Sequence, residues 1–460
     1  MIKQMTTNNK VVDISIVVAT NRPVKFLKEI LISIYKTSTL KLEVIVVNDD
    51  PTREFTNSDF KRFLELNMVS SDLLNLKIIN NEKNSGPGFS RNCGINVAIG
   101  SYILFIDDDD ELDLSVLKVL PDMRQQPDLI SLGFEDTSTV FTNYDLQKKL
   151  PALKIFEIKK LQQAFLENVF LPAQIQPYLF SREFINSNNI KFPSAYVGED
   201  LAFNTMVMLK AKSAYSIPGF FYKYISRPGT LKSSQGTERS IDLLRCLVDL
   251  YNFKNQVGTL NQTAEKFCYE IMTFYQSLFC MRVLLASSKT DNTTPQSDFF
   301  VGNESQIVKN VFENKIDASE LRDFINKIAE ELKKICVQKL IPLLENFQKV
   351  FVFCVGSLGR SIAKLVAEGS NKEVIFVDEM FDKFPTNKVD GLGLISPMDL
   401  YSSDENKCVI ICNPQPAIEM KIANAIEKNE KSNKNHNLIF GSQLIKESAS
   451  SFFGKCEVVF

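Results

Sequence analysis

Short apolar runs alternate with helix-forming stretches through the first hundred residues, and this alternation constrains the fold more than any other feature. Four runs have the length and composition of buried strands, namely residues 14–19 (ISIVVA), 42–47 (LEVIVV), 76–79 (LKII) and 102–106 (YILFI). Helical spacing follows the first run, at Leu27, Ile30, Leu31 and Ile34, and residues 88–99 predict another helix. Buried strands that alternate with helices predict an α/β fold, with a doubly wound and mostly parallel sheet.

The rest of the chain divides into two further patterns. With 460 residues, the chain is too long for one compact core. Residues 129–134 and 178–181 predict strands, residues 158–169 and 200–210 predict helices, and residues 237–347 are mainly helical. A second set of apolar runs begins near residue 350. We therefore expect a first domain over residues 1–235, a helical region over 236–347 and a small α/β domain over 348–460.

The composition excludes several classes of protein. Hydrophobic residues make up 44% and charged residues 23%, as in globular proteins, and the net charge of −2 gives no general attraction for nucleic acid. The nine cysteines are odd in number and scattered, which indicates reduced thiols and a cytoplasmic protein. A single histidine and the lack of a C-x-x-C pair argue against a zinc site.

No apolar stretch has the roughly 18 residues that a membrane span needs, and the first ten residues lack the core of a signal peptide. We expect a cytoplasmic protein. Peripheral contact with the inner face of the cell membrane stays open. An oligomer formed through the helical or C-terminal region also stays open.

Polar residues follow three of the predicted strands. Thr20 follows the first strand, Asp49 the second, and the run Asp107-Asp108-Asp109-Asp110 the strand at 102–106. In doubly wound sheets, ligands bind outside the carboxyl ends of the strands. Four adjacent carboxylates repel one another, and Mg²⁺ or Mn²⁺ shared with substrate phosphates would offset that repulsion. Turn residues and helix caps are the alternative interpretation.

A fourth polar segment is Gly198-Glu199-Asp200, which opens the apolar stretch LAFNTMVML. Both acids are favourable in the first turn of a helix. One of them could instead serve as a general base that takes a proton from an attacking hydroxyl. The sequence leaves both interpretations open.

Together these segments resemble the family 2 glycosyltransferases of the GT-A fold. The resemblance covers residues 13–235 in family order, through SIVVATNRPVKFLKEILISI, EVIVVNDDPT, NEKNSGPGFSRNCGINVAIGSYILFIDDDDEL, SREFINSNNIKFPSAYVGEDLAFNTMVMLKA and YKYISRPGTLKS. The third segment is the most specific. Its matching residues are Asn84, Gly86, Arg91, Asn92, Gly94, Ala98, Gly100 and Tyr102.

The resemblance implies a role for each donor-side residue. Thr20 and Asp49 fall where the family holds the nucleotide, with Asp49 facing the base, and Arg91 falls in the nucleotide-binding segment. Asp107 and Asp109 fall on the outer positions of the D-x-D motif. Asp109 is the first choice as metal ligand, and Asp107 contacts the ribose or the metal. The fourth aspartate leaves this register open by one residue, which adds Asp108 to the donor-binding candidates.

On the acceptor side, the resemblance implies that Asp200 is the catalytic base and that Glu199 lies beside it. Arg227 falls in a loop that contacts the diphosphate. Many relatives hold the metal with a histidine, and none lies near here, so Arg227 or Lys232 would assist the leaving diphosphate instead. The implied enzyme is an inverting, metal-dependent glycosyltransferase. It would move a sugar from a nucleotide-sugar, with a UDP-sugar favoured, to a glycan, lipid-linked or protein-linked acceptor in surface polysaccharide synthesis. The alternative is a catalytically silent glycan-binding or scaffold protein with the same fold.

The last 113 residues carry a second candidate site. The strand VFVFCV leads into GSLGR, and Asp378 ends the next predicted strand. Phosphate at a helix N-terminus with an aspartate on a ribose would suit a nucleotide, although the full G-x-G-x-x-G pattern is absent. The segment resembles Rossmann-like modules attached to some polysaccharide-biosynthesis enzymes. Nucleotide binding and a structural or interaction role both stay open.

Overall fold

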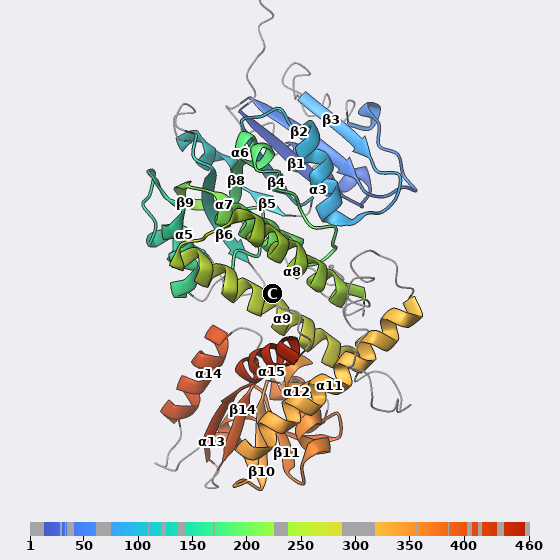
Figure 1. Ribbon diagram of the computed structural model, residues 1–460, viewed down its shortest axis with the longest axis vertical. Helices are drawn as coiled ribbons and strands as arrows, with labels where there is room; N and C mark the ends of the chain where they lie inside the picture. The colour runs from blue at the N-terminus through green and yellow to red at the C-terminus, as the bar shows by residue number, and fades with distance from the viewer. Residues whose placement is uncertain are drawn as a thin grey trace, which may run out of the picture. The chain divides into compact units, whose positions relative to one another are not determined.

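The computed structural model describes residues 13–27, 30–32, 34, 41–60, 75–108, 110–120, 126–136, 143–168, 171–224, 238–287, 318–354, 357–384, 386–402, 407–412, 416–429 and 437–455. Contacts along the chain define two compact units (Figure 1). The first comprises residues 1–234 and 245–271, and the second comprises residues 235–244 and 272–460. The helical region expected at 236–347 is thus shared between both units, and its treatment as a separate domain stays a prediction.

The first unit is built on one nine-stranded sheet. Its strands are β1 (Ile14–Thr20), β2 (Leu42–Asn48), β3 (Asn75–Asn80), β4 (Tyr102–Ile106), β5 (Glu111–Leu112), β6 (Leu129–Asp136), β7 (Ile155–Glu157), β8 (Tyr178–Ser181) and β9 (Ser213–Tyr224). The order is β3-β2-β1-β4-β8-β6-β9-β5, with β7 paired to β9. The pairs β1–β2, β2–β3 and β1–β4 are parallel, so these strands end at one edge. Every strand expected in the first 110 residues is present, and the α/β fold class is confirmed.

Helices complete the first unit. They are η1 (Val24–Phe26), α3 (Gly86–Val97), η3 (Leu114–Val119), α4 (Tyr144–Lys148), α5 (Ile158–Asn168), α6 (Arg182–Ser187) and α7 (Glu199–Lys210). Two longer helices, α8 (Glu238–Val257) and α9 (Gln262–Ser287), each contribute residues to both units. No described helix is long and apolar enough to cross a membrane.

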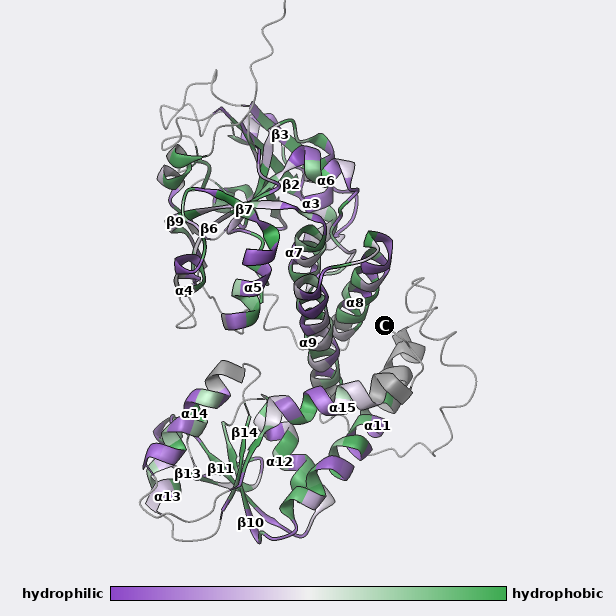
Figure 2. Ribbon diagram, turned by 60° about the vertical axis from the view of Figure 1, so that its left-hand side comes forward, coloured by the Kyte–Doolittle hydropathy of each residue, from purple (hydrophilic) through white to green (hydrophobic). Residues whose placement is uncertain are grey.

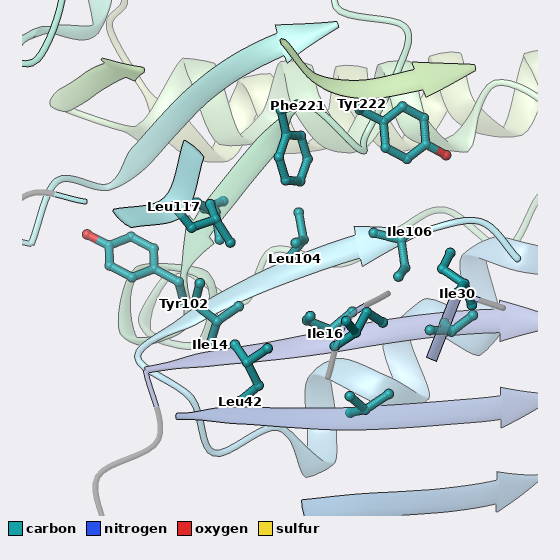
Figure 3. Packing of buried hydrophobic residues seen from close by; sticks show 14 of the residues in the cluster. Ile14, Ile16, Ile30, Leu42, Tyr102, Leu104, Ile106, Leu117, Phe221 and Tyr222 are labelled. Carbon is teal, nitrogen blue, oxygen red and sulfur yellow. The ribbon is translucent and has the colours of Figure 1, made fainter. Parts of the chain in front are cut away.

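Alternate residues of the central strands face opposite sides, as strand geometry requires. Ile14, Ile16 and their neighbours on β2 and β4 pack into one cluster (Figure 3). Leu27, Ile30, Leu31 and Ile34 are all buried in the same cluster, as their helical spacing predicts. Phe221 and Tyr222 of β9 join it from the other half of the sheet.

Helix α3 lies unusually close to β1 because a glycine faces the strand. A β-carbon at Gly94 would collide with both γ-carbons of Val17. A β-carbon at Gly88 would lie 2.5 Å from the carbonyl oxygen of Pro193. Gly94, one of the matching residues, and Gly88 therefore serve close packing, which fixes α3 and the side chains that it carries.

Strand β9 was not expected from the sequence. Pro218 and Gly219 interrupt its apolar pattern, and both residues are uncommon inside strands. In the structure they lie at a bulge, where Gly219 has φ of 116° and a β-carbon at Gly133 of β6 would collide with its carbonyl. The bulge lets β9 continue to Tyr222, whose side chain reaches the functional site.

The second unit contains a six-stranded sheet of order β12-β13-β11-β10-β14-β15. Its strands are β10 (Lys349–Phe353), β11 (Glu373–Val377), β12 (Lys388–Val389), β13 (Leu392–Ile395), β14 (Cys408–Ile411) and β15 (Asn437–Phe440). Its helices are α11 (Ala318–Leu344), α12 (Ser357–Gly369), η5 (Phe381–Lys383), α13 (Pro397–Ser402), α14 (Pro416–Asn429) and α15 (Gly441–Lys455). Five strands are parallel and only β12 runs against them. The strands near the β11 and β14 labels are green in Figure 2, as buried parallel strands should be.

Candidate functional site

The carboxyl ends of β1, β2 and β4 bring the candidate residues to one edge of the sheet. Thr20 pairs in register with Asn48 of β2, and Val18 pairs with Ile106 of β4. The hydroxyl of Thr20 donates to a carboxylate oxygen of Asp108, one step beyond these strands. Thr20, Asp49, Asp107 and Asp108 therefore share one site, as expected for a doubly wound sheet.

Asp49 is buried and its carboxylate is engaged with the start of α3. It accepts hydrogen bonds from Asn81 Nδ2 at 2.7 Å, from the Ser85 backbone N–H at 3.0 Å and from the Gly86 N–H at 2.8 Å. A carboxylate at this position satisfies the unpaired amides and the dipole of the helix N-terminus. Gly86, with φ of 85°, makes the turn that presents those amides. The visible function of Asp49 is thus to fix α3, and its contact with a nucleobase stays a prediction.

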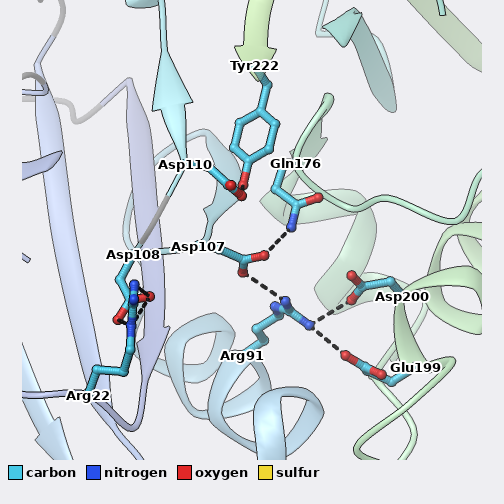
Figure 4. A network of polar contacts seen from close by, with 9 residues as sticks. All are labelled: Arg22, Arg91, Asp107, Asp108, Asp110, Gln176, Glu199, Asp200 and Tyr222. Carbon is cyan, nitrogen blue, oxygen red and sulfur yellow. Dashed lines mark hydrogen bonds and ion pairs between the residues drawn. The ribbon is translucent and has the colours of Figure 1, made fainter. Parts of the chain in front are cut away.

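The aspartate run is divided among different partners (Figure 4). Asp108 forms an ion pair with Arg22, and its carboxylate also accepts from Thr20. Asp107 accepts from Gln176 Nε2 at 2.7 Å and from Arg91 Nη2 at 3.2 Å. Asp110 accepts from the hydroxyl of Tyr222. Three neighbouring carboxylates thus have three separate environments, while Asp109 lies outside the described residues.

Exposure further separates these carboxylates. The Asp107 side chain is 33% exposed, whereas that of Asp108 is 10% exposed. Asp110 is buried beside Tyr222. Burial, with Asp107 and Asp110 nearby, raises the pKa of Tyr222 well above its ordinary value, so its hydroxyl remains a hydrogen-bond donor. Asp107 is the described member of the run that is open to a ligand from solvent.

Glu199 and Asp200 form the first turn of α7, with Gly198 before them in the left-handed region at φ of 90°. Both carboxylates bond to Arg91 Nη1, Glu199 at 2.9 Å and Asp200 at 2.7 Å. Burial raises the pKa of Glu199 above its ordinary value, although Arg91 acts in the opposite direction. The Asp200 side chain is 18% exposed and that of Glu199 is 8% exposed, so Asp200 is the more accessible acid.

Several residues of the site were not singled out from the sequence. Gln176 comes from the loop before β8, and Tyr222 comes from β9, 112 residues from its partner Asp110. Gln176 lies outside the matching segments, and Tyr222 begins the segment YKYISRPGTLKS without a role that the resemblance assigns to it. Only the folded chain brings both residues to the aspartates. Arg22 lies in the turn after β1, inside the first matching segment, but the resemblance assigns it no role. Arg227 and Lys232 lie outside the described residues, so their expected contact with diphosphate stays a prediction.

The second unit presents its candidate site differently. Cys354 follows β10 with φ of 79°, and a β-carbon at Gly359 would collide with its carbonyl oxygen. Asp378 follows β11, and its carboxylate accepts from the Met380 N–H at 2.8 Å. The parallel sheet and the helix after its first strand agree with the expected α/β unit. Nucleotide binding there stays a prediction.

Comparisons with known proteins agree with the geometry of the first unit. Residues 15–182 match the sequence profile described as Glycosyl transferase family 2. The cholesterol galactosyltransferase of Borreliella burgdorferi is 26% identical over 208 residues, which are 43% of this chain and 55% of that protein. The poly(ribitol-phosphate) beta-N-acetylglucosaminyltransferase TarS of Staphylococcus aureus is 34% identical over 106 residues, which are 23% of this chain and 17% of TarS. The crystal structure of S. aureus TarS 1–349 in complex with UDP-GlcNAc aligns over 70% of this chain and 92% of that chain, with 17% identity and a TM-score of 0.44.

The matched segment spans only 55% of the galactosyltransferase, so the similarity concerns the first unit and not the whole length of the relatives. Within that unit, the profile match, the strand order and the clustered acids agree. Residues 15–182 of the first unit thus form a glycosyl transferase family 2 domain. This confirms the family for that segment, and the mixed α/β sheet agrees with the GT-A fold that the sequence resembles.

Proposed function

We propose that this chain is an inverting glycosyltransferase that moves a sugar from a nucleotide-diphosphate donor to a hydroxyl of a glycan, lipid-linked or protein-linked acceptor. The observation that carries the proposal is a set of hydrogen bonds that connects acids across this edge of the sheet. Asp107 at the end of β4, Arg91 of α3 and Asp200 of α7 are connected by hydrogen bonds of 3.2 and 2.7 Å. The candidate donor-binding acid and the candidate base are thus held by one arginine.

The acids suit a divalent cation as an aid to diphosphate departure. Mg²⁺ and Mn²⁺ prefer oxygen ligands and commonly use one or two carboxylates together with substrate phosphates. Among the described residues, no three histidine, cysteine or acidic side chains form a ready metal cluster. Asp107, which is partly exposed, would be one ligand, and Asp109 would be the other. A cation bound there would neutralise the charge that develops on the leaving diphosphate.

The reaction requires one proton transfer by the protein. Asp200 takes the proton of the acceptor hydroxyl, whose oxygen then forms a bond to the anomeric carbon. The bond between that carbon and the diphosphate oxygen breaks on the opposite face, so the configuration inverts. Asp200 fits this role because it is the more exposed acid of the α7 turn and is fixed by Arg91.

The donor is proposed to be a UDP-sugar, and names of relatives guide the first choices. One relative is named a galactosyltransferase and another an N-acetylglucosaminyltransferase. Their named acceptors, cholesterol and poly(ribitol-phosphate), differ in chemistry, so we propose only a surface glycan or glycolipid. A screen would measure hydrolysis of UDP-, GDP- and CMP-sugars with Mn²⁺ or Mg²⁺, starting from UDP-galactose and UDP-N-acetylglucosamine. An acceptor screen would follow.

Asp200→Asn tests the base directly. We expect transfer to fall by roughly 10²–10⁴-fold, the usual contribution of a general base. Donor affinity, measured by calorimetry, should stay nearly unchanged. Asp390→Asn is a matched control, since Asp390 is 53% exposed on the second unit. Full activity in Asp200→Asn would remove Asp200 from the mechanism.

The alternative is a catalytically silent module that binds glycans or scaffolds an assembly. It predicts donor or glycan binding with no turnover of any nucleotide-sugar in the presence of either metal. Such a result would replace the proposed enzyme by a binding protein. The hydrogen bonds that connect Asp107 through Arg91 to Asp200 favour the enzyme, because simple glycan binding does not require an acid held in place as a base.

We further propose a cytoplasmic location, with contact at the inner face of the membrane when the acceptor is lipid-linked. Eight cysteines in the described part of the chain are free thiols, as in a reducing compartment. Burial raises the pKa of Cys408 to about 12, so this thiol resists oxidation. Cell fractionation would test the location. Recovery only from an extracellular fraction would contradict it.

A further inference from the structure

One guanidinium group connects three acids of the site, Asp107, Glu199 and Asp200. Arg91 Nη1 donates to Glu199 at 2.9 Å and to Asp200 at 2.7 Å, while Nη2 donates to Asp107 at 3.2 Å (Figure 4). The family resemblance places Arg91 in a nucleotide-binding segment. In the structure, its side chain is only 6% exposed and is surrounded by acids of this chain. Little of its surface is left for a nucleotide.

The position of Arg91 is fixed from several sides. Its guanidinium lies 5.5 Å from the centre of the Phe192 ring, which stacks on Phe203 at 3.9 Å. The next residue, Asn92, exchanges two hydrogen bonds of 2.9 Å with the backbone of Phe192. Close packing of Gly94 against Val17 holds α3 itself. The guanidinium therefore has one defined location, which suits the placement of another group.

Arg91 is the cation that three acids share. The charged groups facing Arg91 are Asp107 from the end of β4 and Glu199 and Asp200 from α7. Burial alone would lower the pKa of Arg91, but the three acids raise it above its ordinary value. Without this cation, three acids would face one another in a largely buried space, which is costly.

We propose that Arg91 is a positioning residue that orients Asp200 as the base and couples it to the donor-side acid Asp107. The proposal rests on the proposed function. Because Nη1 binds Oδ1 of Asp200, it sets the direction in which that carboxylate faces the acceptor. Because Nη2 binds Asp107, the same group relates the base to the donor. Arg91 acts through these acids, not by contact with the nucleotide.

The test uses the full chain with Arg91→Gln and Arg91→Lys. For each variant, kcat, donor KM, donor Kd by calorimetry and the pH profile of kcat are measured. In Arg91→Gln we expect kcat to fall by roughly 10²-fold, as for a misplaced catalytic group. Donor Kd should stay within about 3-fold of the wild-type value, well short of the roughly tenfold or greater loss that removal of a charge-assisted hydrogen bond to the nucleotide would cause.

The pH profile separates positioning from a merely structural effect. In Arg91→Gln, Asp200 would face Asp107 and Glu199 with no compensating cation. The acid limb of kcat should therefore move to higher pH. Arg91→Lys keeps the charge but cannot form the three-way fork, so kcat should fall while the acid limb stays in place. If circular dichroism shows that Arg91→Gln is unfolded, Arg91→Lys alone carries the test through its kcat and donor Kd.

Two further variants serve as comparisons. Arg360→Gln removes an exposed arginine paired with Asp390 on the second unit and should leave every parameter unchanged. Arg22→Gln removes the partner of Asp108 and should raise donor KM without moving the acid limb. Weakened donor binding with unchanged kcat in an Arg91 variant would overturn the positioning role alone. A folded wild-type protein that turns over no nucleotide-sugar would overturn the proposed function, and the Arg91 role with it.

Discussion

At the scale of single residues, identical side chains have different functions because their partners differ. The sequence shows four adjacent aspartates but cannot distinguish them, since their partners come from distant segments. Arg22 forms an ion pair with Asp108, Gln176 donates a hydrogen bond to Asp107, and Tyr222 donates one to Asp110. Motif spacing made Asp107, Arg91 and Asp200 candidates, because the resemblance assigns them roles. It assigned none to Gln176, which lies outside the matching segments, or to Tyr222, which begins one of them, because their contacts depend on the folding of β8 and β9.

The register of the aspartates can be tested with two matched variants. Asp107→Asn should weaken metal-dependent donor binding by tenfold or more, because Asp107 is the exposed carboxylate. Asp110→Asn should leave donor binding intact but lower the free energy of unfolding by about 1 kcal/mol, because the charge-assisted bond from Tyr222 is weakened. Calorimetry with and without EDTA, and thermal unfolding, would measure these effects. If Asp110→Asn weakens donor binding and Asp107→Asn does not, the D-x-D motif would be Asp108 and Asp110 in place of Asp107 and Asp109.

Glu199→Gln should change stability in a pH-dependent way. Burial raises the pKa of Glu199 above 4.5, so the folded state binds this proton more tightly than the unfolded state. The carboxyl therefore favours folding below pH 4.5, and this contribution is lost as the pH rises through the folded pKa. At neutral pH the buried carboxylate is ionised, which lowers the free energy of unfolding, and the neutral side chain of glutamine removes this destabilisation.

The expected result is a higher free energy of unfolding for Glu199→Gln than for wild type at pH 7, with a difference that shrinks at pH 4. Glu157→Gln is the control, since Lys159 lowers the pKa of that exposed carboxyl and the sign is opposite. Urea unfolding at both pH values would measure the difference. A Glu199→Gln variant that is less stable at pH 7 would show that its pairing with Arg91 outweighs burial.

At the scale of elements, the sequence predicted those whose pattern is local. Strands β1, β2 and β4 are mainly apolar runs, and a helix was predicted over residues 88–99, so the observed bounds of these strands and of α3 agree with the predictions within two residues. Strand β9 was missed because Pro218 and Gly219 interrupt it, and β5, with two residues, is too short to show a pattern. The carboxyl edge of the parallel strands was predictable. The loops and antiparallel strands that complete the site were not.

Gly94→Ala tests whether the contact between α3 and β1 positions the site. The added methyl group would collide with Val17, and overpacking of this kind costs about 1–3 kcal/mol. Since α3 carries Arg91, activity should fall together with the free energy of unfolding. Val17→Ala in the same chain should restore part of both, because it makes room for the methyl group. Gly393→Ala is the control, where the nearest atom to a β-carbon is 4.0 Å away. The contact would be contradicted if the loss of unfolding free energy in the double variant equalled the sum of the losses in the two single variants.

At the scale of the whole molecule, the two units share an α/β architecture but differ in the character of their sheet edges. In the first unit, Arg22 and Arg91 lie among the acids. In the second unit, the carboxyl edge carries Asp378, Glu379 and the buried Glu419. Burial first, and then these three acids, raise the pKa of Cys354 to about 12. A similar order of strands therefore does not imply a similar ligand.

This difference predicts that the full chain binds nucleotide at a single site. Glu419 accepts from the Ser442 N–H at 3.0 Å, so a carboxylate of the chain already occupies the N-terminus of α15. A phosphate near this edge would meet Asp378 and Glu419, and like charges at close range oppose binding. Calorimetry of the full chain should give one UDP per chain, and NAD should produce no saturable heat. In Asp107→Asn, which weakens the first site, any remaining tight nucleotide binding would have to come from the second unit and would contradict the prediction. Glu419→Gln removes a negative charge only from the carboxyl edge of the second sheet. If the first unit alone binds UDP, this variant should bind UDP no more tightly than the wild type.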